Sequence, residues 1–423
     1  MVHIHSLPGG LRILVEELPH THSVSIGCFV SVGSGHEQHA LAGVSHFIEH
    51  MIFKGSQGYP TPKLISDAIE GVGGILDAYT SFESTVYYAK VAHIHFERAL
   101  ALLADIIQHP RFAQRDIEKE RRVITEELHE TEDTPSDWVH TLLDAAMWGD
   151  QPLGRDIAGD EASVASLDPQ ALVDYWRQHY TQSSIVISLA GNIAAEYAIE
   201  RVRHAFGKLP HGQAYAALES LPPRPGPALM FQGDDSEQAN FCLGFPGVAQ
   251  NDPDRRALLV LDTVLGGGMS SRLVQEIREE QGLAYSIGSF SREHHDTGKW
   301  VVFGSVEPTK LEECLHTILR ELWRLKAEGI TEAELAQVKE QVKGGILLSL
   351  EDSWSVAARN GSHMLRYGQV IPVEQVVAEV EAIQSEDVLR VARRMLRPEV
   401  MHLALIGPYD EQDRQMFEQL LAM

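Results

Sequence analysis

An internal repeat on either side of a proline-rich segment constrains the fold of this chain most. The apolar segments Ile185–Gly191 and Met401–Gly407 each read as a strand that ends in glycine, at an offset of 216 residues (407 minus 191). Between them, Leu221–Pro227 holds four prolines, which stiffen the chain and exclude a helix. The sequence therefore predicts two domains of similar fold and a linker: residues 1–215, residues 228–423 and, between them, residues 216–227.

The helices and strands of the two halves also correspond. The helical segments Phe96–Ile107 and Leu311–Trp323 match in character, and each precedes a long charged helix. Strands such as Val24–Val32 and Ser84–Val91 are short and partly alternating. This mixed order favours an α+β class, with two sandwich domains that each have a largely antiparallel sheet and helices on one face. We expect the two domains to form half or all of a clamshell.

Composition excludes several classes of function. The net charge of −25 over 423 residues disfavours a nucleic-acid-binding protein, because phosphate contacts need a basic surface. No apolar stretch approaches the roughly 20 residues of a membrane span, and no signal peptide is readable. We therefore expect a cytoplasmic protein that does not associate with a membrane. The three cysteines, Cys28, Cys242 and Cys314, are too far apart in the sequence for a CxxC zinc site and read as buried thiols.

A His-x-x-Glu-His motif carries the strongest chemical signal. His46 and His50 lie one turn apart on a helix predicted over Leu41–Lys54, which is the spacing at which two imidazoles bind one zinc ion. Glu49 lies beside them, and this order is the inverted form of the commoner His-Glu-x-x-His motif. Because the chain has 21 histidines, an ordinary helix with solvated or buried histidines remains the alternative.

A third ligand is expected on the helix that contains residues 116–129. At about 100° per residue, its apolar residues define a buried face, and Glu120 and Glu127 flank that face. Glu126 points to solvent on the same wheel. Because a buried carboxylate is costly unless it is paired or binds metal, we predict that Glu127 is the third ligand. Glu120 is then a partner of a ligand histidine.

These residues resemble those of the insulinase and pitrilysin class of zinc peptidases, in the short-chain branch that includes the mitochondrial processing peptidase and its bacterial relatives. The resemblance runs nearly end to end. It rests on these segments: Gly43–Gly55, Glu120–Glu127, Pro152–Arg155, His179–Tyr180, Ala190–Asn192, Leu265–Leu273 and Glu276–Tyr285.

The resemblance implies further site residues. It implies that Arg278 and Tyr285, seven residues apart, reach across a cavity to substrate near the zinc, where a guanidinium and a phenol are apt donors to a developing oxyanion. From the residues alone, a helix-surface arginine and a core tyrosine are the favoured interpretation. The resemblance also implies an edge strand that binds substrate by β-addition. This strand holds Asp77, Ala78, Tyr79 and Thr80, with Asp77 where the family commonly has asparagine.

The predicted function is that of a zinc-dependent endopeptidase with one Zn²⁺ per chain, in which Glu49 is the general base toward water. The second half has no His-x-x-Glu-His, and the helix correspondence puts Gly345 opposite Glu127, so only the first half keeps the chemistry. We expect peptides or unfolded segments as substrates, with a preference for basic stretches, and a homodimer or a heterodimer with a related chain. The alternative is a non-catalytic subunit of a processing-peptidase-like complex.

Overall fold

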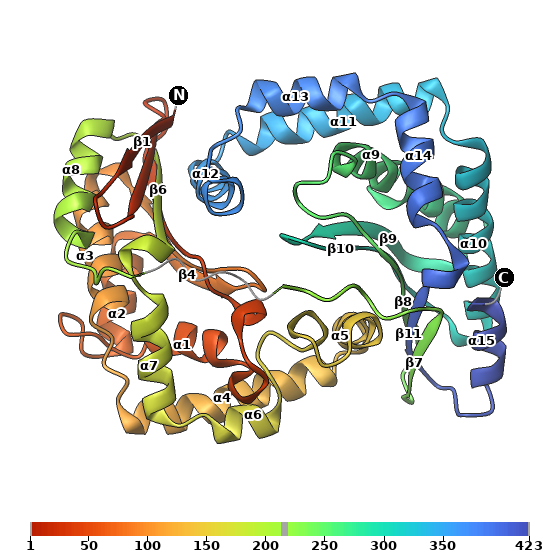
Figure 1. Ribbon diagram of the computed structural model, residues 1–423, viewed down its shortest axis with the longest axis horizontal. Coiled ribbons are helices and arrows are strands. Elements are labelled where there is room, and N and C mark those ends of the chain that lie inside the picture. The colour runs from red at the N-terminus through yellow and green to blue at the C-terminus, as the bar shows by residue number, and fades with distance from the viewer. Residues whose placement is uncertain (1, 213–218, 422–423) are drawn as a thin grey trace. The chain divides into compact units, whose positions relative to one another are not determined.

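The chain packs as two compact units, and each is built from several segments (Figure 1). The computed structural model describes residues 2–212 and 219–421. Unit 1 consists of Met1–Leu128, Asp156–Leu218 and Leu347–Ile371. Unit 2 consists of His129–Arg155, Glu219–Ile346 and Pro372–Met423. The predicted domain boundaries, 1–215 and 228–423, stay a prediction. Residues 216–218 of the predicted linker lie outside the described residues.

Unit 1 is built on a six-stranded sheet with the order β1-β2-β6-β3-β5-β4. Only β2 and β6 run parallel among these neighbours. The central strand β6 is buried on both faces, which explains why its sequence is a continuous apolar run. The strands are β1 (Val2–Ser6), β2 (Arg12–Glu17), β3 (Ser23–Val30), β4 (Ile75–Thr80), β5 (Thr85–Ala92) and β6 (Ile185–Gly191).

Helices cover both faces of this sheet. One face packs in a large core against α1 (Val44–Ile52), α2 (Pro62–Ile69), α3 (Phe96–Gln108), α4 (Gln114–Glu132), α6 (Glu161–Ser166), α7 (Pro169–His179) and α8 (Ala195–Phe206). The other face presents Leu14, Phe29 and Val86 to α12 (Ser353–Tyr367), which comes from the second half of the chain. The expectation of helices on one face therefore describes most of the helices but omits α12.

Unit 2 repeats this plan with a five-stranded sheet in the order β7-β11-β8-β10-β9. Its strands are β7 (Ala228–Gly233), β8 (Ala239–Pro246), β9 (Ala284–Glu293), β10 (Gly298–Val306) and β11 (His402–Gly407). Its helices include α9 (Arg255–Gly266), α10 (Leu311–Glu328), α11 (Glu332–Ser349), α13 (Val373–Ala382), α14 (Ser385–Met395) and α15 (Arg414–Leu421). Helix α5 (Pro135–Trp148), from the first half, packs on β8 and β11.

The two sheets share one topology, and this confirms the repeat. β6 pairs with β2 in parallel and with β3 antiparallel, and β11 pairs with β7 in parallel and with β8 antiparallel. The orders β2-β6-β3-β5-β4 and β7-β11-β8-β10-β9 then correspond strand for strand. The predicted α+β class with two sandwich-like halves is therefore confirmed. No helix within residues 2–212 and 219–421 is long and apolar enough to cross a membrane.

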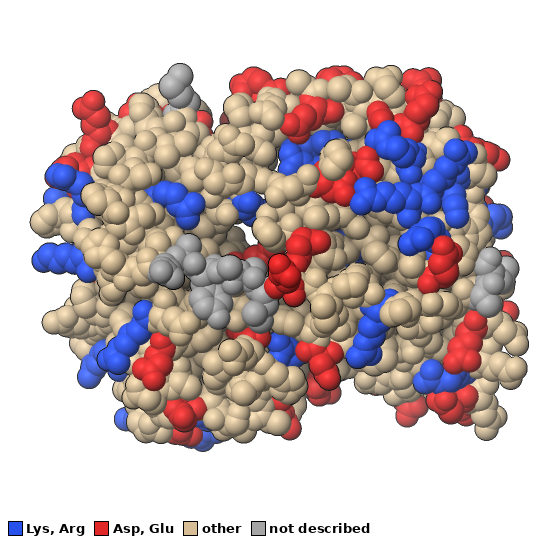
Figure 2. All heavy atoms as spheres, viewed as in Figure 1, with Lys and Arg blue, Asp and Glu red and all other residues tan. Residues whose placement is uncertain are grey.

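Basic side chains gather over α14 in Figure 2, in the upper right of the view. These positive charges are balanced by carboxylates, because Arg390 and Arg394 on α14 both contact Asp254, at 2.7 and 2.9 Å. Arg394 also contacts Asp252 at 2.7 Å. These ion pairs tie α14 to the segment before α9, and they neutralise the arginines on this surface.

The buried His402 gives unit 2 a predictable response to acid. Its side chain is fully buried at the start of β11, and burial lowers the pKa of His402 to about 4, from 6.5. Below pH 6.5 the unfolded chain therefore binds a proton at this histidine, whereas the folded chain does not. The contribution of neutral His402 to the free energy of unfolding is complete above pH 6.5 and is lost as the pH falls toward 4. We expect His402 to cost about 2 kcal/mol of stability between pH 8 and pH 5.

Urea unfolding at both pH values measures this effect. The His402→Leu variant should lose less stability on acidification than the wild type does. Replacement of the half-exposed His316 on α10 by alanine is the control for the loss of a histidine side chain from unit 2. An unaltered pH dependence in the His402→Leu variant would contradict the prediction.

Candidate metal centre

Helix α1 presents both histidines of the motif, and its first turn is held firmly. It begins at Val44 rather than at the predicted residue 41, because Gly43 adopts φ 87°. A Cβ atom there would lie 2.2 Å from the carbonyl oxygen of Ala158, so only glycine fits. The buried carboxylate of Glu37 accepts hydrogen bonds from the backbone N–H groups of Gly43 and Ser45, at 2.7 and 2.8 Å. This anchors the start of the helix.

Helix α4 brings Glu127 to the two histidines. The Nε2 atoms of His46 and His50 lie 3.2 Å apart. Oε2 of Glu127 lies 3.4 Å from Nε2 of His50 and 3.9 Å from Nε2 of His46. Ligand atoms around a tetrahedral zinc ion, with bonds of about 2.0–2.1 Å, are about 3.3–3.5 Å from one another. The three side chains, grouped within 4.8 Å, therefore have the spacing and the donor types that Zn²⁺ requires.

Glu120 sets the orientation of His50. Its carboxylate is only 1% exposed, and Oε2 lies 3.3 Å from Nδ1 of His50 and 2.8 Å from Nζ of Lys54. A proton on Nδ1 of His50 that is donated to Glu120 leaves the lone pair on Nε2, which faces Glu127. The helical wheel placed Glu120 at a half-buried edge, but the structure buries it, because His50 and Lys54 satisfy its charge.

The pKa values of the two histidines shift in opposite directions. Burial, with a smaller contribution from the nearby His50, lowers the pKa of His46 to about 3, so this imidazole is neutral near pH 7. Burial also disfavours the charged form of His50, but its contact with Glu120 and the charges of Glu127 and Glu49 outweigh burial and raise the pKa of His50. These residues bind a divalent ion with both imidazoles neutral, so zinc must displace any proton that His50 carries.

Glu49 lies next to the cluster on α1 and has the properties of a base. Burial raises the pKa of Glu49, against the opposing effect of a hydrogen bond from Thr80. Oγ1 of Thr80 donates to Oε2 of Glu49 at 2.5 Å. A carboxylate whose pKa is raised toward neutrality accepts a proton more readily at physiological pH.

The predicted substrate strand is β4, and it is an edge strand of the unit 1 sheet. Exposed and half-buried residues alternate along β4, as expected of a strand with two unlike faces. Ala78 packs with the core on the face of α1, and Thr80 bonds to Glu49 on that same face. Asp77 points to the opposite face, where it accepts a hydrogen bond from Tyr88 at 3.3 Å. Tyr79 is 41% exposed. The structure thus places residues 77–80 on an edge strand, and their role toward substrate stays a prediction.

Arg278 and Tyr285 form an exposed pair in unit 2. Arg278 belongs to the π-helical segment Val274–Glu280, and Tyr285 lies near the start of β9. The guanidinium lies 5.1 Å from the centre of the tyrosine ring, and Tyr285 is 78% exposed. This exposure rules out the interpretation of Tyr285 as a core aromatic. The role of the pair toward substrate stays a prediction.

Two residues that support the cluster, Lys54 and Glu37, have no predicted role, and a third, Thr80, has a different one. The motif gives Lys54 no role, although its position four residues after His50 in the predicted helix indicates that the two lie on one face. Glu37 precedes α1 in a loop, where no periodicity marks it as a cap. Thr80 was assigned to substrate binding, and its bond to Glu49 depends on a strand that is distant in sequence.

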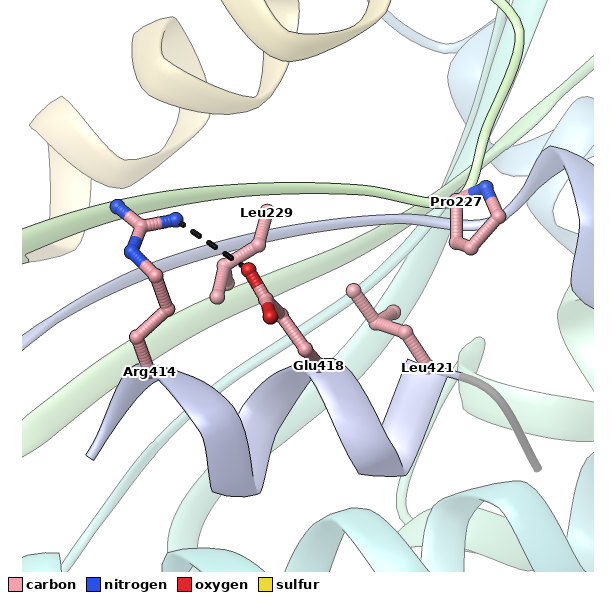
Figure 3. Close-up of a pocket in the computed structure, with 5 residues that line it drawn as sticks. All are labelled: Pro227, Leu229, Arg414, Glu418 and Leu421. Atoms are coloured by element: carbon pink, nitrogen blue, oxygen red, sulfur yellow. Dashed lines mark ion pairs between the residues drawn. The ribbon is translucent and has the colours of Figure 1, made fainter. Parts of the chain in front are cut away.

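A pocket in unit 2 has a different character (Figure 3). Its lining combines three apolar side chains with an ion pair between Arg414 and Glu418, 3.8 Å apart on α15. The apolar residues are Pro227, Leu229 and Leu421. None of the five is a residue predicted for the metal site, and paired charges on one helix do not constitute a catalytic group.

Glu120→Gln should weaken zinc binding about 10- to 100-fold, because the neutral amide neither holds the His50 tautomer as firmly nor balances the charge of Lys54. Zinc titration against a competing chelator measures this change. The matched control is Glu118→Gln, which alters a half-exposed carboxylate of the same helix and should leave the affinity unchanged. Equal zinc affinity in wild type and Glu120→Gln would contradict this role.

Comparison with known proteins identifies a family across most of the chain. Residues 12–161 match the model of insulinase (peptidase family M16), and residues 166–342 match the model of the peptidase M16 inactive domain. A Bacillus subtilis protein named as an uncharacterized zinc protease is 38% identical over 96% of this chain and 98% of its own length. Another so named, from Mycobacterium tuberculosis, is 37% identical over 99% of this chain and 95% of its own.

Solved structures show the same fold. A protease from Helicobacter pylori has a TM-score of 0.89 at 20% identity, with 96% of this chain and 100% of that chain covered. A structure of a peptidase M16 inactive domain from Pseudomonas fluorescens has a TM-score of 0.89 at 21% identity, with 97% and 98% covered. The family models and the relatives above 30% identity show that this chain belongs to the insulinase-type peptidase family M16.

Proposed function

We propose that this protein is a zinc-dependent endopeptidase that cleaves peptides or unfolded segments. The observation that carries the proposal is the convergence of His46, His50 and Glu127 within 4.8 Å, with Glu49 beside them on α1. The relatives named as zinc proteases support the same conclusion. One Zn²⁺ per chain, held by these three residues, would polarise the scissile carbonyl and lower the pKa of a water molecule.

In this proposal the residues of the chain have separate roles in catalysis and in substrate binding. Glu49 accepts the proton of the attacking water and passes it to the nitrogen of the leaving amine. Glu120 holds His50 in the required tautomer through Nδ1. The free edge of β4 offers backbone groups to an extended peptide, which pairs with it as an added strand. We also propose that the two halves enclose the substrate, with Arg278 and Tyr285 as donors to its carbonyl oxygen.

The net charge of −25 supports a preference for peptides with basic stretches, which an acidic protein attracts. Assembly as a homodimer, or as a heterodimer with a related chain, belongs to the same proposal. Digestion of a peptide library that contains matched acidic and basic sequences measures the preference. Equal cleavage of the two sets would remove the charge preference and leave the peptidase proposal intact.

Removal and return of zinc tests the function itself. The purified chain should contain about one zinc ion, should cleave peptides, should lose this activity on dialysis against a chelator and should regain it with added Zn²⁺. The outcome that overturns the proposal is a chain that binds zinc fully but cleaves no member of the library. That result would favour the non-catalytic subunit.

A further inference from the structure

Thr80 connects the predicted substrate strand to the predicted base. Its hydroxyl Oγ1 donates to Oε2 of Glu49 at 2.5 Å, a short hydrogen bond to a carboxylate. Thr80 is the last residue of β4, and Glu49 lies on α1, 31 residues earlier in the chain. The bond therefore joins two elements that the fold brings together.

The backbone of Thr80 is held in place from two sides. It pairs with Thr85 at the closed end of the β4–β5 hairpin. The next residue, Ser81, donates its N–H to the carbonyl of Ser84 at 2.8 Å and accepts from the N–H of Ser34 at 3.1 Å. A hydroxyl on such a fixed backbone defines one position for the atom that it contacts.

The geometry also leaves Glu49 able to react. Thr80 contacts Oε2, so the other carboxylate oxygen of Glu49 is not engaged by this bond. A carboxylate anchored through one oxygen has fewer side-chain orientations and keeps the second oxygen for proton transfer. Because the anchor lies on β4, the base is also aligned with the strand on which a peptide is expected to pair.

We propose that Thr80 is a positioning residue that holds the carboxylate of Glu49 in its reactive orientation. This inference rests on the proposed function, in which Glu49 is the base. It goes beyond that function because it assigns the orientation of the base to the side chain of Thr80. That side chain is not one of the three candidate ligands, and it takes no part in the expected backbone pairing with the peptide.

Three variants test this role. Thr80→Val has nearly the shape of threonine without the hydroxyl, and Thr80→Ser keeps the hydroxyl. The matched control is Thr85→Val, which removes the hydroxyl of the paired residue, whose Oγ1 donates to the carbonyl of Val32 instead. The measurements are zinc content, thermal stability, kcat and KM on a library peptide, and a crystal structure of the zinc-loaded Thr80→Val protein.

We expect Thr80→Val to keep its zinc and its KM and to lose about 10- to 100-fold in kcat, the cost of a hydrogen bond to a charged group. Its crystal structure should show the Glu49 carboxylate rotated from its wild-type position. Thr80→Ser should recover most of the loss, and Thr85→Val should keep the wild-type kcat.

Any of four results would overturn the proposal: an unchanged kcat in Thr80→Val, a loss of zinc in Thr80→Val, a failure of Thr80→Ser to recover activity, or an unmoved Glu49 carboxylate in the Thr80→Val crystal structure. The crystal structure separates this inference from the proposed function. If the wild-type protein cleaves no peptide, the function fails, whereas an unmoved Glu49 carboxylate in Thr80→Val refutes the positioning role by itself.

Discussion

The Glu49→Gln variant should bind zinc as the wild type does and lose about 10²- to 10⁴-fold of its peptidase activity, the contribution of a general base. The amide has nearly the size and shape of the carboxylate, so α1 and its two histidines should remain in place. It has no basic oxygen that accepts a proton from water. The loss should therefore appear in kcat, with zinc content unchanged.

Metal analysis and peptide cleavage on the same preparations measure both halves of this prediction. Glu70→Gln is the control, because Glu70 is an exposed carboxylate in the short turn that follows α2. It should change neither quantity. If Glu49→Gln keeps most of the activity, the proton transfer belongs to another group and the assignment of the base is wrong.

Glu127→Gln should weaken zinc binding by more than about 100-fold, since loss of a ligand exceeds the loss from a neighbouring partner. The chain offers a matched control in the preceding residue. Glu126 is exposed on the same turn of α4, whereas the Glu127 side chain is 42% exposed and its Oε2 lies 3.4 Å from His50. Glu126→Gln should bind zinc as tightly as the wild type.

Zinc titration with a competing chelator resolves this pair of variants, and activity at saturating zinc provides a second measurement. Both substitutions remove one negative charge from adjacent residues, so a general electrostatic effect on the metal would appear in both. A fall in zinc content confined to Glu126→Gln would show that the wrong glutamate was chosen. An equal fall in both would indicate charge, and not coordination.

The face of α4 was predictable because its period is strong. Ile117, Ile124 and Leu128 form the buried stripe that the helical wheel predicted, and Glu126 is exposed as expected. The repeat of two sheets was predictable for a similar reason, since β6 and β11 are buried on both faces and read as apolar runs. In both cases local pattern and tertiary burial agree.

Other features depend on contacts between distant segments, which periodicity does not report. The complete burial of Glu120 requires Lys54, in the turn that follows α1, as its partner. The bond from Thr80 to Glu49 requires the end of β4 to meet α1. The start of α1 at Val44 depends on the close approach of the Ala158 carbonyl to Gly43. Each of these is a property of the assembled unit.

Each half of the chain contributes one helix to the unit that is built mainly from the other half. This affects how the protein can be divided into fragments and how it folds during synthesis. A fragment that stops at the proline-rich segment lacks α12, so Leu14, Phe29 and Val86 of the first sheet would meet water. The fragment with the second half lacks α5, which covers β8 and β11. Each sequence repeat alone therefore lacks a helix that covers one face of its sheet. During synthesis the first sheet is covered on both faces only after α12 is made, and we expect a genetic split at the proline-rich segment to yield two fragments prone to aggregate.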